Sequence, residues 1–135
     1  QSMELLFHQN EIKVECNIDE PVYIWADEIQ IEEVFRNYIS NAMNHADGER
    51  VIRITLEKME DVIRINVFNT GKNIPEESIE HIWDKFYKVD KARTREYGGS
   101  GVGLSIVKAV MEGINQKYGV RNEENGVTFW FEVSC

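Results

Sequence analysis

Residues 98–104 read Gly-Gly-Ser-Gly-Val-Gly-Leu, and apolar residues at helical spacing follow at once. Alternate glycines leave backbone N–H groups free of side-chain obstruction and permit backbone conformations with positive φ. A helix that begins there points its unpaired N–H groups and the positive end of its dipole at the loop. This arrangement is typical of a phosphate-binding loop. The same pattern also suits a flexible loop that only precedes a helix.

Two common phosphate motifs do not fit this stretch. The run lacks the Gly-Lys-Ser/Thr ending of a Walker motif, and no βαβ unit precedes it, as the dinucleotide-binding fingerprint would require. Residues 88–97 are instead a polar, basic segment with few apolar residues. Such a segment beside a glycine loop is typical of a mobile lid. We therefore interpret residues 88–101 as a lid.

The composition is that of a folded, acidic domain. The chain has 135 residues, of which 42% are hydrophobic, and a net charge of −9. This length fits one domain over residues 1–135. The negative charge argues against nucleic acid and against direct contact with an anionic membrane. We expect residues 1–3 to be left over from cloning and the chain to be part of a longer protein.

Apolar patterns predict an α+β fold. Strands are expected at 11–18, 22–25, 51–58, 61–68, 118–121 and 127–133, and helices at 27–46, 75–83 and from the glycine loop to 113. Successive strands are often joined by short turns, which predicts antiparallel pairs. The expected architecture is a two-layer α/β sandwich. Its mixed, mostly antiparallel sheet of about five strands is covered on one face by about three helices.

The predicted helix 27–46 carries a line of polar side chains. Asn37, Asn41 and His45 recur every four residues along one edge of its apolar stripe. Asparagine is a mediocre helix former, so the line calls for an explanation. One explanation is hydrogen bonding on a solvated face. The other is an amide oxygen offered to Mg²⁺, which prefers oxygen ligands and takes most of them from water and phosphates.

A polar turn follows the predicted strand 61–68. Asn69 stands at the strand end, where its amide could read the edge of a base because it both accepts and donates hydrogen bonds. Gly71 would let the backbone approach a flat ring. A plain β-turn would give the same sequence.

Taken in order, these segments closely resemble the ATP-binding catalytic domain of sensor histidine kinases. That domain belongs to a superfamily shared with DNA gyrase, the ninety-kilodalton heat-shock chaperones and mismatch-repair ATPases. The resemblance covers roughly residues 10–134 and implies the Bergerat-type ATP-binding fold. Its motifs are the N box Asn-Tyr-Ile-Ser-Asn-Ala (37–42), the first glycine box Asn-Thr-Gly-Lys-Asn-Ile-Pro (69–75), the F box Ile-Trp-Asp-Lys-Phe-Tyr-Lys-Val-Asp (82–90) and the second glycine box Gly-Ser-Gly-Val-Gly-Leu (99–104).

The resemblance implies roles for individual residues. Asn41 would coordinate Mg²⁺, and Asn37 and His45 would lie near the phosphates of ATP, which makes Asn37 and Asn41 the implied catalytic residues. The implied nucleotide-binding set is Asn37, Asn41, His45, Asn69, Gly71, Ile74, Lys88, Gly99, Ser100, Gly101, Val102, Gly103 and Leu104. The lid cation would be Lys88, or Arg93 with Arg95. Further implied contacts are Tyr38 and Ile106 at the adenine pocket and Phe86 at the base of the lid, although Phe86 equally suits a plain core position.

Three positions depart from the family pattern. The first glycine box usually begins with Asp, where this chain has Asn69, and its second glycine is replaced by Asn73, which also tolerates a left-handed backbone. Charge-assisted hydrogen bonds are roughly twice as strong as neutral ones. The neutral acceptor should therefore weaken ATP binding roughly five- to tenfold. Asn44 stands where the family often has a lysine, which would remove one phosphate contact.

The resemblance also implies what this chain does. None of its histidines has the acid-then-proline context of a phosphoacceptor. We therefore expect the chain to bind Mg-ATP and donate the γ-phosphoryl group to a histidine on a separate dimerisation hairpin upstream, without phosphorylating itself. The other implied partner is a response regulator. The isolated domain would be a cytoplasmic monomer, and the full protein a homodimer anchored in a bacterial plasma membrane.

Two alternatives stay open at this point. One is a nucleotide-binding or interaction module of the same fold without catalysis. The departures from the family pattern at Asn69 and Asn73 favour this alternative. The other is a serine kinase of the anti-sigma type, although residues 82–97 look more like the F box and lid of sensor kinases.

Overall fold

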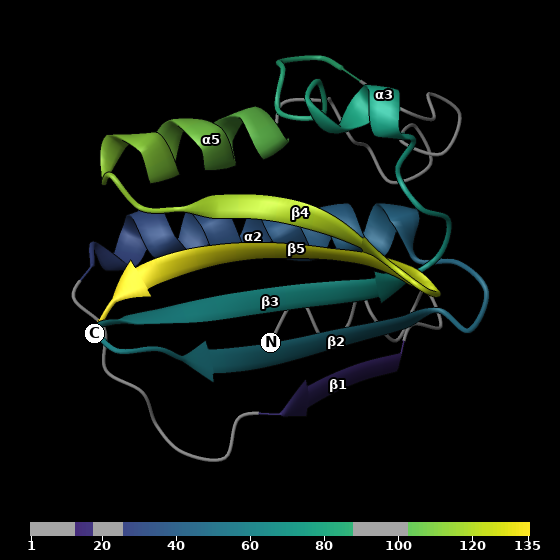
Figure 1. The fold of residues 1–135 in the computed structure, drawn as a ribbon, viewed down its shortest axis with the longest axis horizontal. Helices are drawn as coiled ribbons and strands as arrows, with labels where there is room; N and C mark the ends of the chain where they lie inside the picture. The colour runs from purple at the N-terminus through teal and green to yellow at the C-terminus, as the bar shows by residue number, and fades with distance from the viewer. Residues whose placement is uncertain (1–12, 18–25, 88–102) are drawn as a thin grey trace.

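The computed structural model describes residues 13–17, 26–87 and 103–135 (Figure 1). Its strands are β1 (Lys13–Asn17), β2 (Val51–Lys58), β3 (Val62–Thr70), β4 (Tyr118–Glu123) and β5 (Gly126–Ser134). Its helices are α2 (Glu28–His45), α3 (Glu76–Ile79) and α5 (Gly103–Gly113). The strand expected at 22–25 and the lid expected at 88–101 lie outside the described residues.

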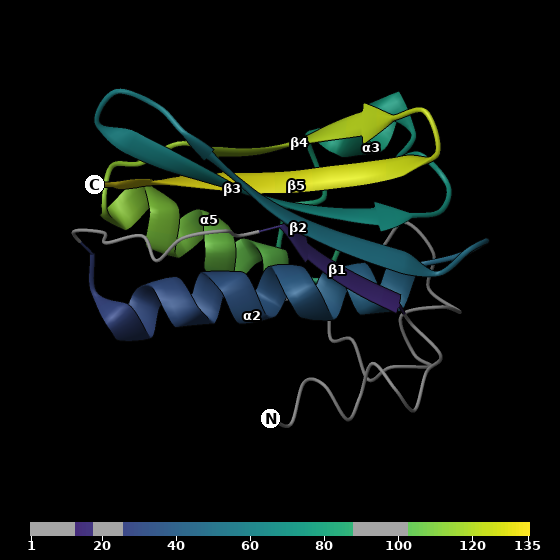
Figure 2. The same ribbon diagram turned by 90° about the horizontal axis from the view of Figure 1, so that it is seen from below.

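The five described strands form one sheet in the order β1-β2-β3-β5-β4. Strand β1 runs parallel to β2, whereas β2, β3, β5 and β4 pair antiparallel with their neighbours. Helices α2 and α5 pack against each other on one face of the sheet (Figure 2). The expected mixed, mostly antiparallel sheet with helices on one face is therefore confirmed.

The core lies between α2, α5 and this face of the sheet. Tyr38 of α2 is fully buried, with its ring centroid 5.4 Å from that of Phe129 and 5.7 Å from that of Phe131. Its hydroxyl donates a hydrogen bond to the Trp130 carbonyl at 3.0 Å. Burial raises the pKa of Tyr38, so the phenol remains a neutral donor. Tyr38 is thus a core residue, and its expected place at the adenine pocket is wrong.

Helix α2 has the bounds that its sequence predicts because both of its ends are defined locally. The Asp27 side chain accepts a hydrogen bond from the Gln30 N–H at 3.0 Å, which satisfies one of the free donors of the first turn. At the other end Ala46 leaves the helical conformation, and Gly48 turns with a φ of 66°.

The segment after β3 differs from its prediction. A helix was expected over 75–83, but α3 ends at Ile79 and the chain continues in turns. Packing explains the difference, since Ile82 is buried and the Trp83 ring meets that of Tyr118 edge-on at 4.9 Å. Phe86 is 65% exposed, with a φ of 70°, so a core position for it is also wrong.

Candidate functional site

The polar line on α2 faces partly away from the core. Asn37, Asn41 and His45 are each half-buried and follow one another along one side of the helix, about 6 Å apart at each step. The Asn37 side chain donates to the Glu33 carbonyl at 2.9 Å, so its amide oxygen points elsewhere. The Asn41 side-chain nitrogen is buried and has no hydrogen-bond partner. A buried unpaired amide is costly, which marks Asn41 as a candidate for a ligand contact.

One end of this line meets the start of α5. A Cβ atom built on Gly103 would lie 3.0 Å from the Asn37 amide oxygen, so the backbone of Gly103 sits directly against that side chain. The last residues of the second glycine box therefore lie beside the first asparagine of the N box. Leu104 packs against the core. The expected site residues Lys88, Gly99, Ser100, Gly101 and Val102 lie outside the described residues.

The other end of the line meets the turn that follows β3. Gly71 has a φ of 146°, and a Cβ atom there would lie 2.6 Å from the His45 carbonyl oxygen. The Asp47 N–H donates to the Thr70 carbonyl at 2.9 Å. Only glycine can adopt this backbone while touching the end of α2 so closely. The turn and the helix end are therefore held together.

Asn69 is buried at the same end of the site. Its side chain is 1% exposed, and its amide nitrogen donates to the Thr70 carbonyl at 3.0 Å. That bond leaves the amide oxygen, which is buried and has no hydrogen-bond partner. Asn69 can therefore offer its amide oxygen as a hydrogen-bond acceptor. Ile74, which follows in the same loop, packs against the core, and Ile106 of α5 is half-buried.

The described residues contain no cluster of three or more histidine, cysteine or acidic side chains that could hold a metal ion. A divalent cation at α2 would therefore rely on a single amide oxygen, completed by water and by oxygens of a bound phosphate. This is the way in which Mg²⁺ is commonly held at nucleotide sites. The residues present thus fit a metal that arrives with its nucleotide.

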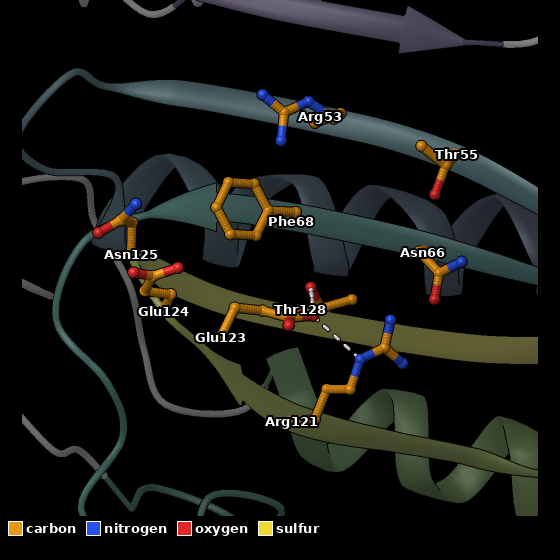
Figure 3. A pocket seen from close by; sticks show the side chains of 9 residues that line it. All are labelled: Arg53, Thr55, Asn66, Phe68, Arg121, Glu123, Glu124, Asn125 and Thr128. Carbon is orange, nitrogen blue, oxygen red and sulfur yellow. Dashed lines mark hydrogen bonds and ion pairs between the residues drawn. The ribbon is translucent and has the colours of Figure 1, made fainter.

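A separate cavity of about 370 Å³ lies on the other face of the sheet (Figure 3). The Arg53 guanidinium lies 5.3 Å from the centre of the Phe68 ring and donates to Glu15 at 2.9 Å. Arg121 donates to Glu123 at 3.0 Å. Sequence reasoning missed this cavity, because alternating polar residues on an outer sheet face carry no distinctive signal. Each of its arginines is already paired with a carboxylate.

Comparison with known proteins decides the family. Residues 26–135 match the family described as "Histidine kinase-, DNA gyrase B-, and HSP90-like ATPase". The chain belongs to this family. Among described helices of this ATPase domain, none is both long and apolar enough to cross a membrane.

Individual relatives place the ATPase domain among sensor histidine kinases. It is 38% identical over 96 residues to "Sensor histidine kinase WalK" of Bacillus subtilis (strain 168). The matched segment makes up 70% of this chain and 16% of that protein. Its fold matches the catalytic domain of histidine kinase ThkA with a TM-score of 0.80 and 33% identity, over 98% of this chain and 86% of that one. It also matches ThkA in complex with the response regulator protein TrrA, with a TM-score of 0.78, 30% identity and coverage of 98% and 38%.

Proposed function

We propose that this domain binds Mg-ATP and donates the γ-phosphoryl group to a histidine on a separate dimerisation hairpin of the same sensor kinase. The observation that carries the proposal is the contact between Gly103 and the Asn37 amide oxygen. That contact joins the second glycine box to the N box. One side of α2 would therefore connect the start of α5, which would bind phosphate, to the buried Asn69 side chain, which would bind the base. The chain spans 16% of the length of its Bacillus subtilis relative, so the acceptor histidine is sought outside it.

The phosphate end of the proposed site uses backbone donors. The first N–H groups of α5 lack partners within the helix, and the helix dipole favours an anion at its start. Asn37, which touches Gly103, would keep this helix start in register with α2. Mg²⁺, when bound, would neutralise charge on the phosphates, and Asn41 would supply its protein oxygen. Phosphoryl transfer depends mainly on such positioning and charge neutralisation.

The base end of the proposed site uses Asn69. Its buried, unpartnered oxygen would accept a hydrogen bond from the exocyclic amine of adenine. Gly71 lies between Asn69 and the His45 carbonyl at the end of α2, so His45 belongs to the base end of the proposed site and not, as the resemblance implies, beside the phosphates. Asn37 and His45 are separated by about 12 Å along the helix axis, a span suited to an extended nucleotide. Asn41 lies one turn of α2 from Asn37 at the phosphate end, where it would reach the Mg²⁺ that the phosphates bring with them.

The proposed partners follow from the resemblance to sensor histidine kinases. ThkA, a structural neighbour, was solved in complex with the response regulator protein TrrA, which supports a response regulator as the partner that receives the phosphoryl group. The full protein is proposed to be a homodimer anchored in a bacterial plasma membrane, with this domain in the cytoplasm as a monomer when isolated. The lid at 88–101, with Lys88 or Arg93 and Arg95, belongs to the same proposal.

Mixing this domain with the purified dimerisation hairpin and γ-labelled ATP tests the transfer. We expect label on the hairpin histidine and none on the domain alone, because the acceptor is separate. ATP binding without transfer would contradict the kinase proposal and favour the non-catalytic module. The specific observation that favours this second candidate is the neutral Asn69 at the position where the family usually has an aspartate.

Restoring the family carboxylate tests the base end. In Asn69→Asp we expect ATP affinity to rise about fivefold, because a charged acceptor forms a stronger hydrogen bond with the adenine amine. We also expect the free energy of unfolding without nucleotide to fall by about 1–2 kcal/mol, because the carboxylate is buried and loses the donor bond to Thr70. Calorimetric titration and thermal melting measure the two changes. Unchanged or weaker ATP binding in a folded variant would remove Asn69 from the base contact.

A further inference from the structure

The loop that follows β3 is attached to the β4–β5 hairpin by side-chain amides. The Asn73 amide nitrogen donates to two carbonyls of the hairpin, those of Glu123 and Gly126, each at 2.9 Å. These two residues pair with each other at the end of the β4–β5 ladder. A carbonyl oxygen has two lone pairs, so each can accept from Asn73 in addition to its ladder bond. One side chain thus fixes the loop to both arms of the hairpin.

A second amide repeats the attachment from the opposite direction. The Asn122 side chain accepts from the Ile74 N–H at 2.8 Å and donates to the Ile74 carbonyl at 3.0 Å. The Gly71 N–H donates to the Asn125 carbonyl at 3.1 Å. The segment 71–74 is therefore bound to the hairpin through Gly71, Asn73 and Ile74. We call this set of hydrogen bonds the hairpin clamp.

The clamp holds the loop that directly follows Asn69, the residue at the end of β3 that forms the base end of the proposed site. Gly71 lies between the hairpin and the end of α2, and a Cβ atom built there would be 3.6 Å from the Asn69 amide nitrogen. A shift of Gly71 would therefore move the surroundings of the Asn69 side chain. Asn73 does not take a positive φ, so the tolerance of asparagine for a left-handed backbone does not account for its presence here. Its side-chain hydrogen bonds supply a different reason for an asparagine at this position.

We propose that Asn73 is a positioning residue, which holds the 71–74 loop so that the Asn69 oxygen is presented to the exocyclic amine of adenine. This inference rests on the proposed function, and it adds a residue that does not touch the nucleotide. A glycine at position 73 would leave the loop attached by the Gly71 and Asn122 bonds alone. Holding a loop in its bound conformation raises affinity because less conformational entropy is lost on binding. Asn73 thereby offsets part of the affinity that the neutral Asn69 acceptor loses.

Two variants of Asn73 and one matched control test the clamp. Asn73→Gly removes the side chain, and Asn73→Asp replaces the donor by a carboxylate that faces two carbonyl oxygens. Asn66→Asp is the control, because Asn66 lies on the other face of the sheet and its amide donates to Glu57 at 2.9 Å. The control thus also places a carboxylate against an acceptor, but far from the loop. If Asn73→Asp does not fold, Asn73→Gly still decides the test.

The measurements are calorimetric titrations of the chain with Mg-ATP and with Mg-inosine triphosphate, which lacks the exocyclic amine. We expect both Asn73 variants to bind ATP about five times more weakly, with a smaller loss for inosine triphosphate, so that selectivity for ATP falls. Amide hydrogen exchange at Gly71 and Ile74 should quicken in both. The control should keep the selectivity and the exchange rates of the unmodified chain.

Three other outcomes would each be decisive. Unchanged ATP affinity in the Asn73 variants would overturn the positioning role. So would an equal loss of ATP affinity in Asn66→Asp, since that would reflect stability alone. If the unmodified chain binds no ATP, the proposed function itself fails and this inference fails with it.

Discussion

Gly126→Ala is expected to lower the free energy of unfolding by about 3 kcal/mol, which corresponds to a fall of about 10 °C in Tm. Gly126 begins β5, is buried, and pairs with Thr70 of β3. A Cβ atom on it would lie 2.0 Å from the Asn69 carbonyl oxygen and 2.9 Å from a ring carbon of Phe68. The first of these contacts is with backbone, so no side-chain rotation can relieve it. The ends of β3 and β5 would have to separate.

The same substitution should also weaken ATP binding, because Asn69 lies at the displaced end of β3. Gly113→Ala is the matched control. Gly113 ends α5, and a Cβ atom there would meet nothing within 4 Å, so this variant should melt at or slightly above the Tm of the unmodified chain. Thermal melting of both variants measures the difference. A Gly126→Ala domain as stable as the control would show that the two strand ends adjust without cost.

Asn41→Ala is expected to abolish the part of ATP affinity that depends on Mg²⁺, a loss of about tenfold or more. The proposed metal site has one protein oxygen, and the described residues offer no acidic cluster to replace it. Folding should be nearly unaffected, because the Asn41 amide nitrogen has no hydrogen-bond partner to lose. Titration with ATP, with Mg²⁺ and with a chelator, separates the metal-dependent part from the rest.

The control for Asn41 is its neighbour Ser40, whose side chain is exposed on α2. Ser40→Ala should keep both the affinity for ATP and its dependence on Mg²⁺. If Asn41→Ala retains the full Mg²⁺ dependence while the domain stays folded, Asn41 is not the metal ligand. A loss of affinity that is equal with and without Mg²⁺ would instead assign Asn41 a contact to the nucleotide itself.

Much of the fold could be predicted because its elements are encoded locally. Helix α2 is predicted almost to the residue, since Asp27 begins it and Gly48 follows its end. Strands β2 and β3 follow from apolar alternation, although β3 runs two residues past its predicted end, to Thr70. The extension depends on pairing with β5, in which Thr70 opposes Gly126. Such pairing partners are distant in sequence and leave no local pattern.

The predictions around α3 failed for a related reason. Pro75 and the acidic residues after it favour a helix start, yet the helix stops at Ile79. The burial of Ile82 and the contact of Trp83 with Tyr118 outweigh the helical preference of the segment. Tyr38 was misplaced because the edge of an apolar stripe does not reveal which side chains face a sheet. Phe129 and Phe131, on a strand far along the chain, enclose it.

The sequence by itself determined the family, the order of the motifs and the periodic elements, because these depend on residue type and spacing along the chain. Only the tertiary structure brought Gly103 against Asn37 and Gly71 against the His45 carbonyl, since these contacts depend on how α2 and α5 cross the sheet. It also decided what Asn73 does. An asparagine can occupy a turn through its backbone or bridge two carbonyls through its side-chain amide. Asn73 does the second because folding places the carbonyls of the β4–β5 hairpin beside it.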